Sequence, residues 1–205
     1  MADDQQAFWN ERFAGNEYLF GTDPNAFLAS QRDRLKPGMR ALAIADGEGR
    51  NGVWLARQGL AVLSTDFSPV ALEKANKLAA AAGVTLNTEC VDLARWNWGA
   101  PRFDVVVAIF VQFTAPPERA RMFANIKQVL LPGGLLLLEG YRPKQLEYGT
   151  GGPSQVENLY TRELLEREFA DMEILQLAEY DAEVNEGSRH KGMSALIDLV
   201  AKKHV

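Results

Sequence analysis

The sequence predicts an α/β protein with an open, mostly parallel sheet covered by helices on both faces. Short apolar runs alternate with helix-like segments between residues 39 and 140, and short connections of this kind favour parallel strands. Two further strand-like runs, 172–184 and 193–203, are joined by eight residues. That spacing is typical of an antiparallel hairpin, so the sheet should end in one.

The parallel strands are expected where the apolar or alternating runs lie, at 39–45, 60–66, 84–90, 103–110 and 135–141. Helices are expected at 50–59, at 68–83 and within 116–134. The helix at 68–83 has the clearest ends, because Ser68 can cap it, Pro69 suits its first position and Gly83 suits a left-handed end. The alternation predicts a doubly wound, Rossmann-like sheet.

The segments outside the parallel part suggest a single domain, 1–205, with three parts. A helical cap is expected at 1–36, with helices at 3–13 and 23–35, and the core at 39–140. Residues 141–205 should form a Gly/Pro-rich lid loop, a short helix at 161–169 and the hairpin.

Composition narrows the class of protein. The 205 residues are 47% hydrophobic and carry a net charge of −5, which argues against a broad nucleic-acid or membrane footprint. The single cysteine, Cys90, excludes an internal disulfide and a cysteine-based zinc site, and it should be an inert thiol in a buried strand. No metal site is expected. The acidic N-terminus and the short apolar runs lead us to expect a cytoplasmic protein.

The loop after the first strand reads G-E-G-R-N-G at 47–52 and matches the dinucleotide fingerprint GxGxxG. Two carboxylates, Asp46 and Glu48, stand among its glycines, and Arg50 offsets only one of them. Negative charges beside a pyrophosphate are unfavourable, whereas a sulfonium and an ammonium tolerate them. We therefore expect the loop to hold S-adenosylmethionine, with Gly52 already inside the next helix.

Two more carboxylates end the following strands. Asp66 can accept both hydroxyls of an adenosine ribose, and Asp92 can accept a hydrogen from the adenine amino group. Phe67 or Leu93 would lie against the ring. Each aspartate alone could instead cap the next turn.

With these motifs, the chain resembles the class I S-adenosylmethionine-dependent methyltransferases, and among them the small bacterial tellurite-resistance-type and thiopurine-type enzymes. The similar stretches include "ADGEGRNGVWLARQG", "STDFSPVALEKA", "CVDL", "LLPGGLLLLEGY" and "NEGSRHKGMSALIDLVAKK". The resemblance implies the class I methyltransferase fold and activity (EC 2.1.1.-). The chain departs from the family pattern at two positions. Many relatives have an acidic residue at the position of Ala43 and a glycine at the position of Ala45.

The resemblance also implies roles for individual residues. The methionine moiety would contact Ala45, Asp46, Gly47 and Gly49. The adenosine would contact Asp66, Phe67, Asp92 and Leu93, and the sulfonium end would lie beside Ile109, Phe110 and Val111. Aromatic residues of the N-terminal segment would close over the cofactor, the candidates being Trp9, Phe13, Tyr18 and Phe20.

The acceptor is less well indicated. Methyl transfer needs no nucleophilic side chain, so no catalytic residue is assigned. The run "IFVQF" after the fourth strand lacks the motif with which amino-methylating enzymes hold a flipped base. The lid loop and the hairpin turn are expected to shape the acceptor pocket. Its candidate side chains are Tyr141, Arg142, Tyr148, Arg189 and His190.

Three functions follow from the sequence. The first is a methyltransferase that acts on a small molecule through sulfur, selenium, tellurium or a ring nitrogen and yields S-adenosylhomocysteine, as a monomer or homodimer. The second is a non-catalytic S-adenosylmethionine-binding module. The third is an NAD-dependent oxidoreductase that uses GxGxxG literally, although no proton-relay pair accompanies it.

Overall fold

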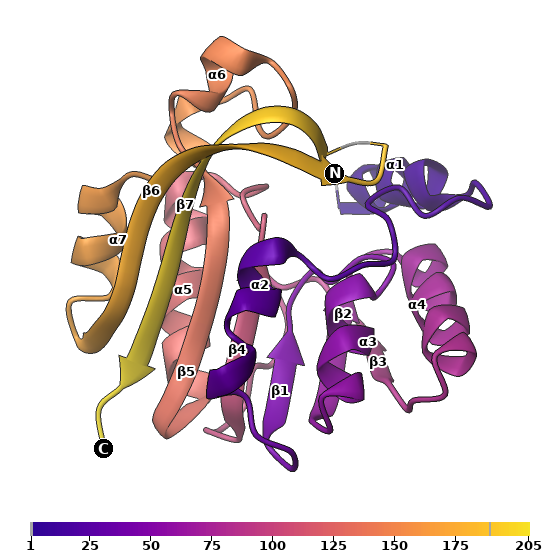
Figure 1. Ribbon diagram of the computed structural model, residues 1–205, viewed down its shortest axis with the longest axis horizontal. Coiled ribbons are helices and arrows are strands. Elements are labelled where there is room, and N and C mark those ends of the chain that lie inside the picture. The colour runs from indigo at the N-terminus through magenta and orange to yellow at the C-terminus, as the bar shows by residue number, and fades with distance from the viewer. Residues whose placement is uncertain (1, 189) are drawn as a thin grey trace. The chain divides into compact units, whose positions relative to one another are not determined.

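The computed structural model describes residues 2–188 and 190–205 (Figure 1). They form two compact units, one of residues 1–96 with 186–189 and one of residues 97–185 with 190–205. The division falls inside the segment 39–140 expected as one core. Strands from the early and late halves of that segment pair mainly within their own unit, which accounts for the division.

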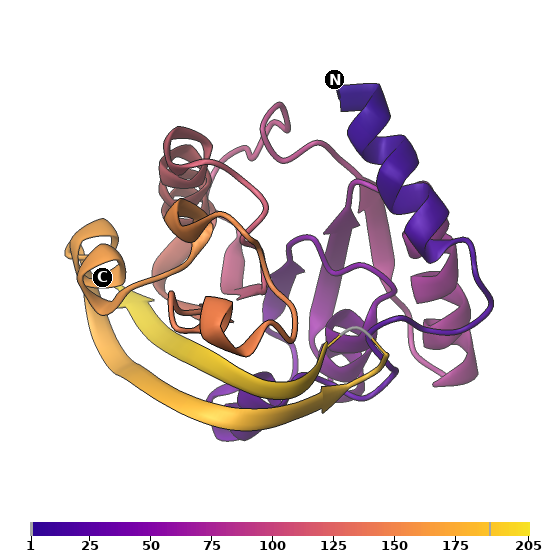
Figure 2. The ribbon, with the colours of Figure 1, turned by 90° about the horizontal axis from the view of Figure 1, so that it is seen from above.

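The first unit contains a parallel three-stranded sheet in the order β3-β2-β1. Its elements are α1 (Ala2–Phe13), α2 (Ala26–Ser30), the 3-10 helix η1 (Arg32–Arg34), β1 (Arg40–Ala43), α3 (Arg50–Arg57), β2 (Ala61–Asp66), α4 (Pro69–Ala81) and β3 (Asn87–Cys90). Helix α1 lies beside α4, as Figure 2 shows from above.

Helix α4 has the ends that its sequence predicts. The Ser68 hydroxyl accepts a hydrogen bond from the Ala71 N–H at 3.2 Å, and Pro69 is the first helical residue. Gly83 is left-handed with φ +69° just past the C-terminus. These caps satisfy backbone groups that a helix end leaves open, so the boundaries are set locally.

The second unit contains the strand order β4-β5-β7-β6, with β4 and β5 parallel and β5 and β7 antiparallel. Its elements are β4 (Phe103–Ile109), α5 (Pro116–Val129), β5 (Leu130–Tyr141), α6 (Gln145–Tyr148), the 3-10 helix η2 (Val156–Asn158), α7 (Arg162–Glu168), β6 (Met172–Glu186) and β7 (His190–Lys203). Strands β6 and β7 run side by side as a long curved ribbon (Figure 2).

Several boundaries differ from the sequence prediction. Strand β3 covers only the second half of the expected 84–90, and the helix expected at 23–35 is divided into α2 and η1. Strand β5 begins at Leu130 instead of 135, because a register shift between Phe103 and Val105 accommodates the intervening Pro-Gly-Gly. The hairpin strands reach Glu186 and His190, so the expected eight-residue link is a much tighter turn.

Candidate active site

The loop between β1 and α3 follows a backbone path that alternates into the left-handed region. Ala45, Gly47 and Gly49 have φ angles of 47°, 58° and 85°. Glycine adopts such angles at little cost, whereas alanine is strained there. The tight turn brings the backbone to the carboxyl end of β1, where open α/β sheets bind ligands. Within the turn, the amides of Asp46, Gly47 and Gly49 donate to the Thr65 carbonyl, the Asp66 carboxylate and the Asp46 carbonyl.

The Asp46 side chain braces this loop internally. Its carboxylate accepts hydrogen bonds from the Gly52 N–H at 3.1 Å and from the Ser64 hydroxyl at 2.8 Å. A Cβ at Gly52 would lie 2.4 Å from the same carboxylate, which confirms that Gly52 serves close packing inside α3. Burial raises the pKa of Asp46 to about 7, so this group is only partly ionised at neutral pH.

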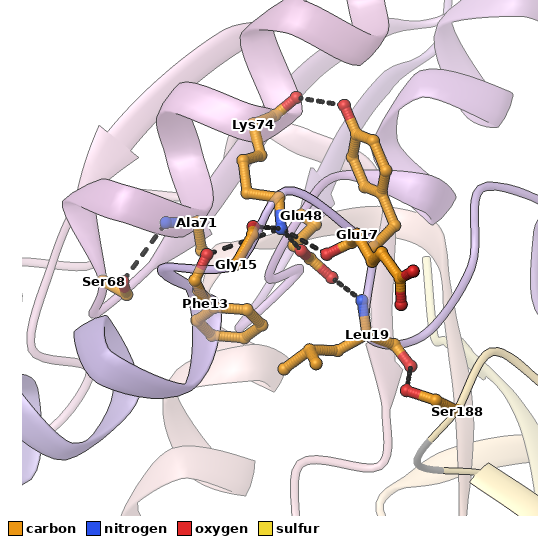
Figure 3. Close-up of polar contacts among 10 residues, drawn as sticks. Phe13, Gly15, Glu17, Leu19, Glu48, Ser68, Ala71, Lys74 and Ser188 are labelled. Carbon is orange, nitrogen blue, oxygen red and sulfur yellow. Dashed lines mark hydrogen bonds and ion pairs between the residues drawn. The ribbon is translucent and has the colours of Figure 1, made fainter.

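The other loop carboxylate, Glu48, points toward the N-terminal segment. It forms an ion pair with Lys74 of α4, and its second oxygen accepts the Leu19 N–H at 2.7 Å (Figure 3). Both loop carboxylates therefore have partners within the chain. The expectation of two unpaired negative charges in this loop is wrong, because Glu48 is paired with Lys74 and Asp46 is partly protonated.

Asp66, at the end of β2, links the glycine loop to the residues that begin α4. One carboxylate oxygen accepts the Gly47 N–H and the other the Ser68 N–H, both at 2.9 Å. Burial raises the pKa of this buried carboxyl. Each oxygen has a second lone pair, so Asp66 can still accept hydrogen bonds from the hydroxyl groups of a ligand.

Asp92 follows β3 on the same edge, because Asp66 and Cys90 are register partners in the β2–β3 pair. The Asp92 carboxylate accepts the Ala94 N–H at 3.0 Å, as a turn-capping aspartate does. Phe67 and Leu93, half-buried, flank the two aspartates in the sequence. Helix α1 reaches this edge, since the Gln6 side chain donates to the Phe67 carbonyl at 2.8 Å.

Phe13 is the aromatic residue that covers the glycine loop. It is buried, and a Cβ at Gly47 would lie 3.6 Å from its ring. Trp9 stacks on it with ring centroids 5.7 Å apart, and Phe20 meets it edge-on at 6.3 Å. Trp9, Phe13 and Phe20 thus form one cluster with Phe13 at its centre, whereas the Tyr18 ring faces Lys74.

In the second unit, Phe110 ends β4 in a left-handed conformation with φ 55°. Its ring stacks on Tyr141 with centroids 4.6 Å apart, and His190 lies edge-on to it at 4.6 Å. Gln112 fixes this arrangement by donating to the Tyr141 carbonyl and accepting the Tyr141 N–H. Strained backbone of this kind persists where the surroundings hold it and is frequent at functional sites.

Comparisons with known proteins agree with this geometry. Residues 41–134 match the family model described as a methyltransferase domain. An uncharacterized protein of Mycobacterium bovis is 30% identical over 102 residues, or 50% of this chain and 37% of that protein. An uncharacterized methyltransferase of Synechocystis is 29% identical over 111 residues, or 53% of this chain and 50% of that protein. The chain thus spans half or less of the length of these relatives.

Solved structures extend the likeness to nearly the whole chain. Magnesium protoporphyrin IX methyltransferase of Synechocystis, with bound S-adenosylhomocysteine, has a TM-score of 0.71 at 15% identity and covers 98% of this chain and 99% of its own. This chain has the class I methyltransferase fold. An enzyme of echinomycin biosynthesis that converts a disulfide into a thioacetal shares the fold with a TM-score of 0.77 at 19% identity, covering 100% of this chain and 93% of its own.

Two further solved structures share the fold. TehB from Haemophilus influenzae has a TM-score of 0.71 at 15% identity and covers 97% of this chain and 67% of its own. The [4+2]-cyclase SpnF has a TM-score of 0.70 at 18% identity and covers 100% of this chain and 97% of its own. At such identities the likeness establishes the fold, and the reaction has to be argued from the site.

Within this methyltransferase fold, two acceptor candidates have structural partners. The Arg142 guanidinium donates to the Leu196 carbonyl at 2.9 Å and forms an ion pair with Asp181, and the Tyr148 hydroxyl donates to Asp181 at 2.9 Å. Both side chains therefore brace the strands beneath the lid loop. Arg189 lies outside the described residues.

Cys90 is exposed, contrary to the expectation of a buried thiol. It lies on β3, the outer strand of its sheet, where alternation in the sequence does not reveal that one face is open. Partial burial and the nearby Asp66 raise the pKa of the thiol, so the thiolate is disfavoured.

Metal-binding clusters and membrane-spanning helices are both absent from the described residues. Within residues 2–188 and 190–205, no group of three or more His, Cys, Asp or Glu side chains is arranged to hold a metal ion. Over the same residues, no helix has the length and hydropathy that crossing a bilayer requires.

Lys74 is the residue of this site that the sequence reasoning missed. It lies on α4 between Ala71, Ala75 and other apolar positions, and it is buried. A lysine on the buried side of a helix is a signal that a partner must be present. Helical spacing cannot show that the partner is Glu48, 26 residues earlier.

Proposed function

We propose that the protein is an S-adenosylmethionine-dependent methyltransferase that acts on a small molecule. One observation carries the proposal. The glycine loop, Asp66 and Asp92 lie at the carboxyl ends of the three neighbouring parallel strands β1, β2 and β3. This set of groups fits the cofactor's chemistry, since glycines let the backbone approach the methionine moiety closely and carboxylates suit ribose hydroxyls and an amino group.

The residues of the chain would bind and orient the cofactor. Backbone groups of Ala45, Asp46, Gly47 and Gly49 would hold the methionine moiety. Asp66 would accept the ribose hydroxyls, while Phe67, Leu93 and Asp92 would enclose the adenine. When bound, the cofactor supplies an electrophilic methyl group that an acceptor displaces in line, so positioning and exclusion of water are the main demands on the protein. Ile109, Phe110 and Val111 would lie beside the sulfonium end.

For the acceptor we propose the surroundings of Phe110, Tyr141 and His190. The two aromatic rings are stacked, and their faces attract cations and planar groups. His190 supplies an imidazole, the side chain best suited to accept a proton near neutral pH when the acceptor atom is a thiol, selenol or ring nitrogen. The proposal of a tellurium acceptor is supported only by the resemblance of the sequence to the tellurite-resistance-type enzymes.

Titration calorimetry tests the cofactor. We expect S-adenosylmethionine and S-adenosylhomocysteine to bind and NAD not to bind. Tight NAD binding without a response to S-adenosylhomocysteine would favour the oxidoreductase instead. A second experiment supplies methyl-labelled cofactor with thiols, selenite, tellurite and heterocycles, and transfer of label to one of them is expected. Binding without any transfer would favour the non-catalytic module or, given SpnF, chemistry other than methyl transfer.

A further inference from the structure

The ammonium of Lys74 is enclosed by the N-terminal segment of residues 13–19, which lies some sixty residues earlier in the chain. It donates to the carbonyls of Gly15 at 2.8 Å and Glu17 at 2.6 Å (Figure 3). The Tyr18 ring centroid lies 5.1 Å from the ammonium, and the Tyr18 hydroxyl donates to the Lys74 carbonyl at 3.2 Å. The segment thus surrounds one buried side chain, which contacts it through several backbone carbonyls and one aromatic ring.

Glu48 joins this arrangement to the glycine loop. One of its oxygens contacts the Lys74 ammonium, and the other accepts the Leu19 N–H. Glu48 stands between Gly47 and Gly49, whose positive φ angles define the loop. The conformation of the loop and the placement of residues 13–19 therefore depend on the same carboxylate.

What the segment covers makes this connection relevant to binding. Phe13 lies over Gly47, and α1, which leads into the segment, reaches Phe67 and Ser68 through Gln6 and Asn10. These are the loop and the strand end to which the cofactor is assigned. The Ser188 N–H also donates to the Leu19 carbonyl at 2.9 Å, so Leu19 is bonded to Ser188 through its carbonyl and to Glu48 through its N–H.

We propose that Lys74 and Glu48 form a latch that holds residues 13–19 over the glycine loop and so slows release of the cofactor. The inference rests on the proposed function. Lys74 is a positioning residue, because it acts through the segment and not on the reacting atoms. Its ammonium contacts the Glu48 carboxylate and the carbonyls of Phe13, Gly15 and Glu17 at the same time, which no neutral side chain of that length can do.

The test compares the wild-type protein with K74M/E48Q, which keeps the alkyl stem and leaves no buried carboxylate without its cation. K77M is the matched control, since Lys77 lies one turn further along α4 and is exposed. The first readout is hydrogen exchange of the Leu19 amide, and the second is the dissociation rate of S-adenosylhomocysteine. We expect both to rise at least about tenfold in K74M/E48Q and to stay unchanged in K77M.

The outcomes separate the latch from the proposed function. If the wild-type protein binds no S-adenosylhomocysteine, the proposed function fails and the latch fails with it. If the wild-type protein binds it and K74M/E48Q matches the wild type in both readouts, only the latch is overturned. An equal loss of amide protection throughout β1 and β2 would also overturn it, because that result indicates a general structural role.

Discussion

Ala45 carries strain that a single substitution can remove. Its φ of 47° is unfavourable for a residue with a Cβ, and the resemblance places a glycine here in many relatives. We expect Ala45→Gly to raise the free energy of unfolding by about 0.5–1 kcal/mol, measured by urea denaturation. Ala43→Gly, two residues earlier in β1, is the control and should lower it by a similar amount. A loss of stability in Ala45→Gly would contradict this account of the loop.

Asp66 has a structural and a proposed binding role, and Asp66→Asn tests the second. The variant retains one oxygen for the Gly47 N–H, gives up the hydrogen bond from the Ser68 N–H, and loses the negative charge that strengthens hydrogen bonds from ribose hydroxyls. We expect affinity for S-adenosylhomocysteine to fall by about 1.5–3 kcal/mol in calorimetry, while the circular dichroism spectrum stays that of the wild type. Glu73→Gln, on the exposed side of α4, should bind normally. Unchanged affinity in Asp66→Asn would refute the ribose assignment.

The elements themselves were predictable where local chemistry determines them, as in α4 with its Ser68 cap, Pro69 and Gly83. The alternation of strands and helices likewise predicts the parallel sheet. Contacts between distant segments were not predictable. The sequence shows Asp46 and Glu48 as charges in a loop, but only the fold shows that one accepts from Ser64 and the other pairs with Lys74. The charge of the loop therefore could not be judged from its sequence, because the partners of both carboxylates are distant.

The turn between β6 and β7 is the element whose role differs most from expectation. A Cβ at Gly187 would lie 2.3 Å from the Leu19 carbonyl oxygen and 2.5 Å from the Gly21 nitrogen. Glu186 forms an ion pair with Arg50 at 2.6 Å and accepts from the Asn25 side chain at 3.1 Å. Residues 186–188 thus pack on the N-terminal segment and the start of α3.

This packing makes Gly187→Ala a sharp test. The variant should lose stability both from its φ of +70° and from the clash with Leu19. Gly149→Ala is a matched control, because Gly149 has a φ of +62° with nothing within 4 Å of its Cβ position. We expect about 1–2 kcal/mol of destabilisation in Gly149→Ala and about 1–3 kcal/mol more in Gly187→Ala. Equal effects in the two variants would show that the turn is not tightly packed.

The stability of the whole chain should depend on pH through buried carboxyls with raised pKa values, among them Asp46, Asp66 and Asp198. Asp198 of β7 is the register partner of Glu139 of β5, and both are buried. Burial raises the pKa of Asp198 to about 6, as it raises the pKa of Asp46 to about 7. Each native carboxyl therefore keeps its proton at pH values where the unfolded chain has lost it.

Because the native state binds more protons in this range, the free energy of unfolding must fall as pH rises. The decline should begin above the ordinary aspartate pKa and level off once the raised values are passed, near pH 7. A fully expressed shift corresponds to about 1.4 kcal/mol per pH unit for each group. Urea denaturation between pH 5 and 8 measures it. Asp198→Asn should reduce the slope below pH 6, where Asp46 still contributes, and should be more stable than wild type at pH 8. Stability that rises across this interval would show that these carboxyls are ionised in the folded protein.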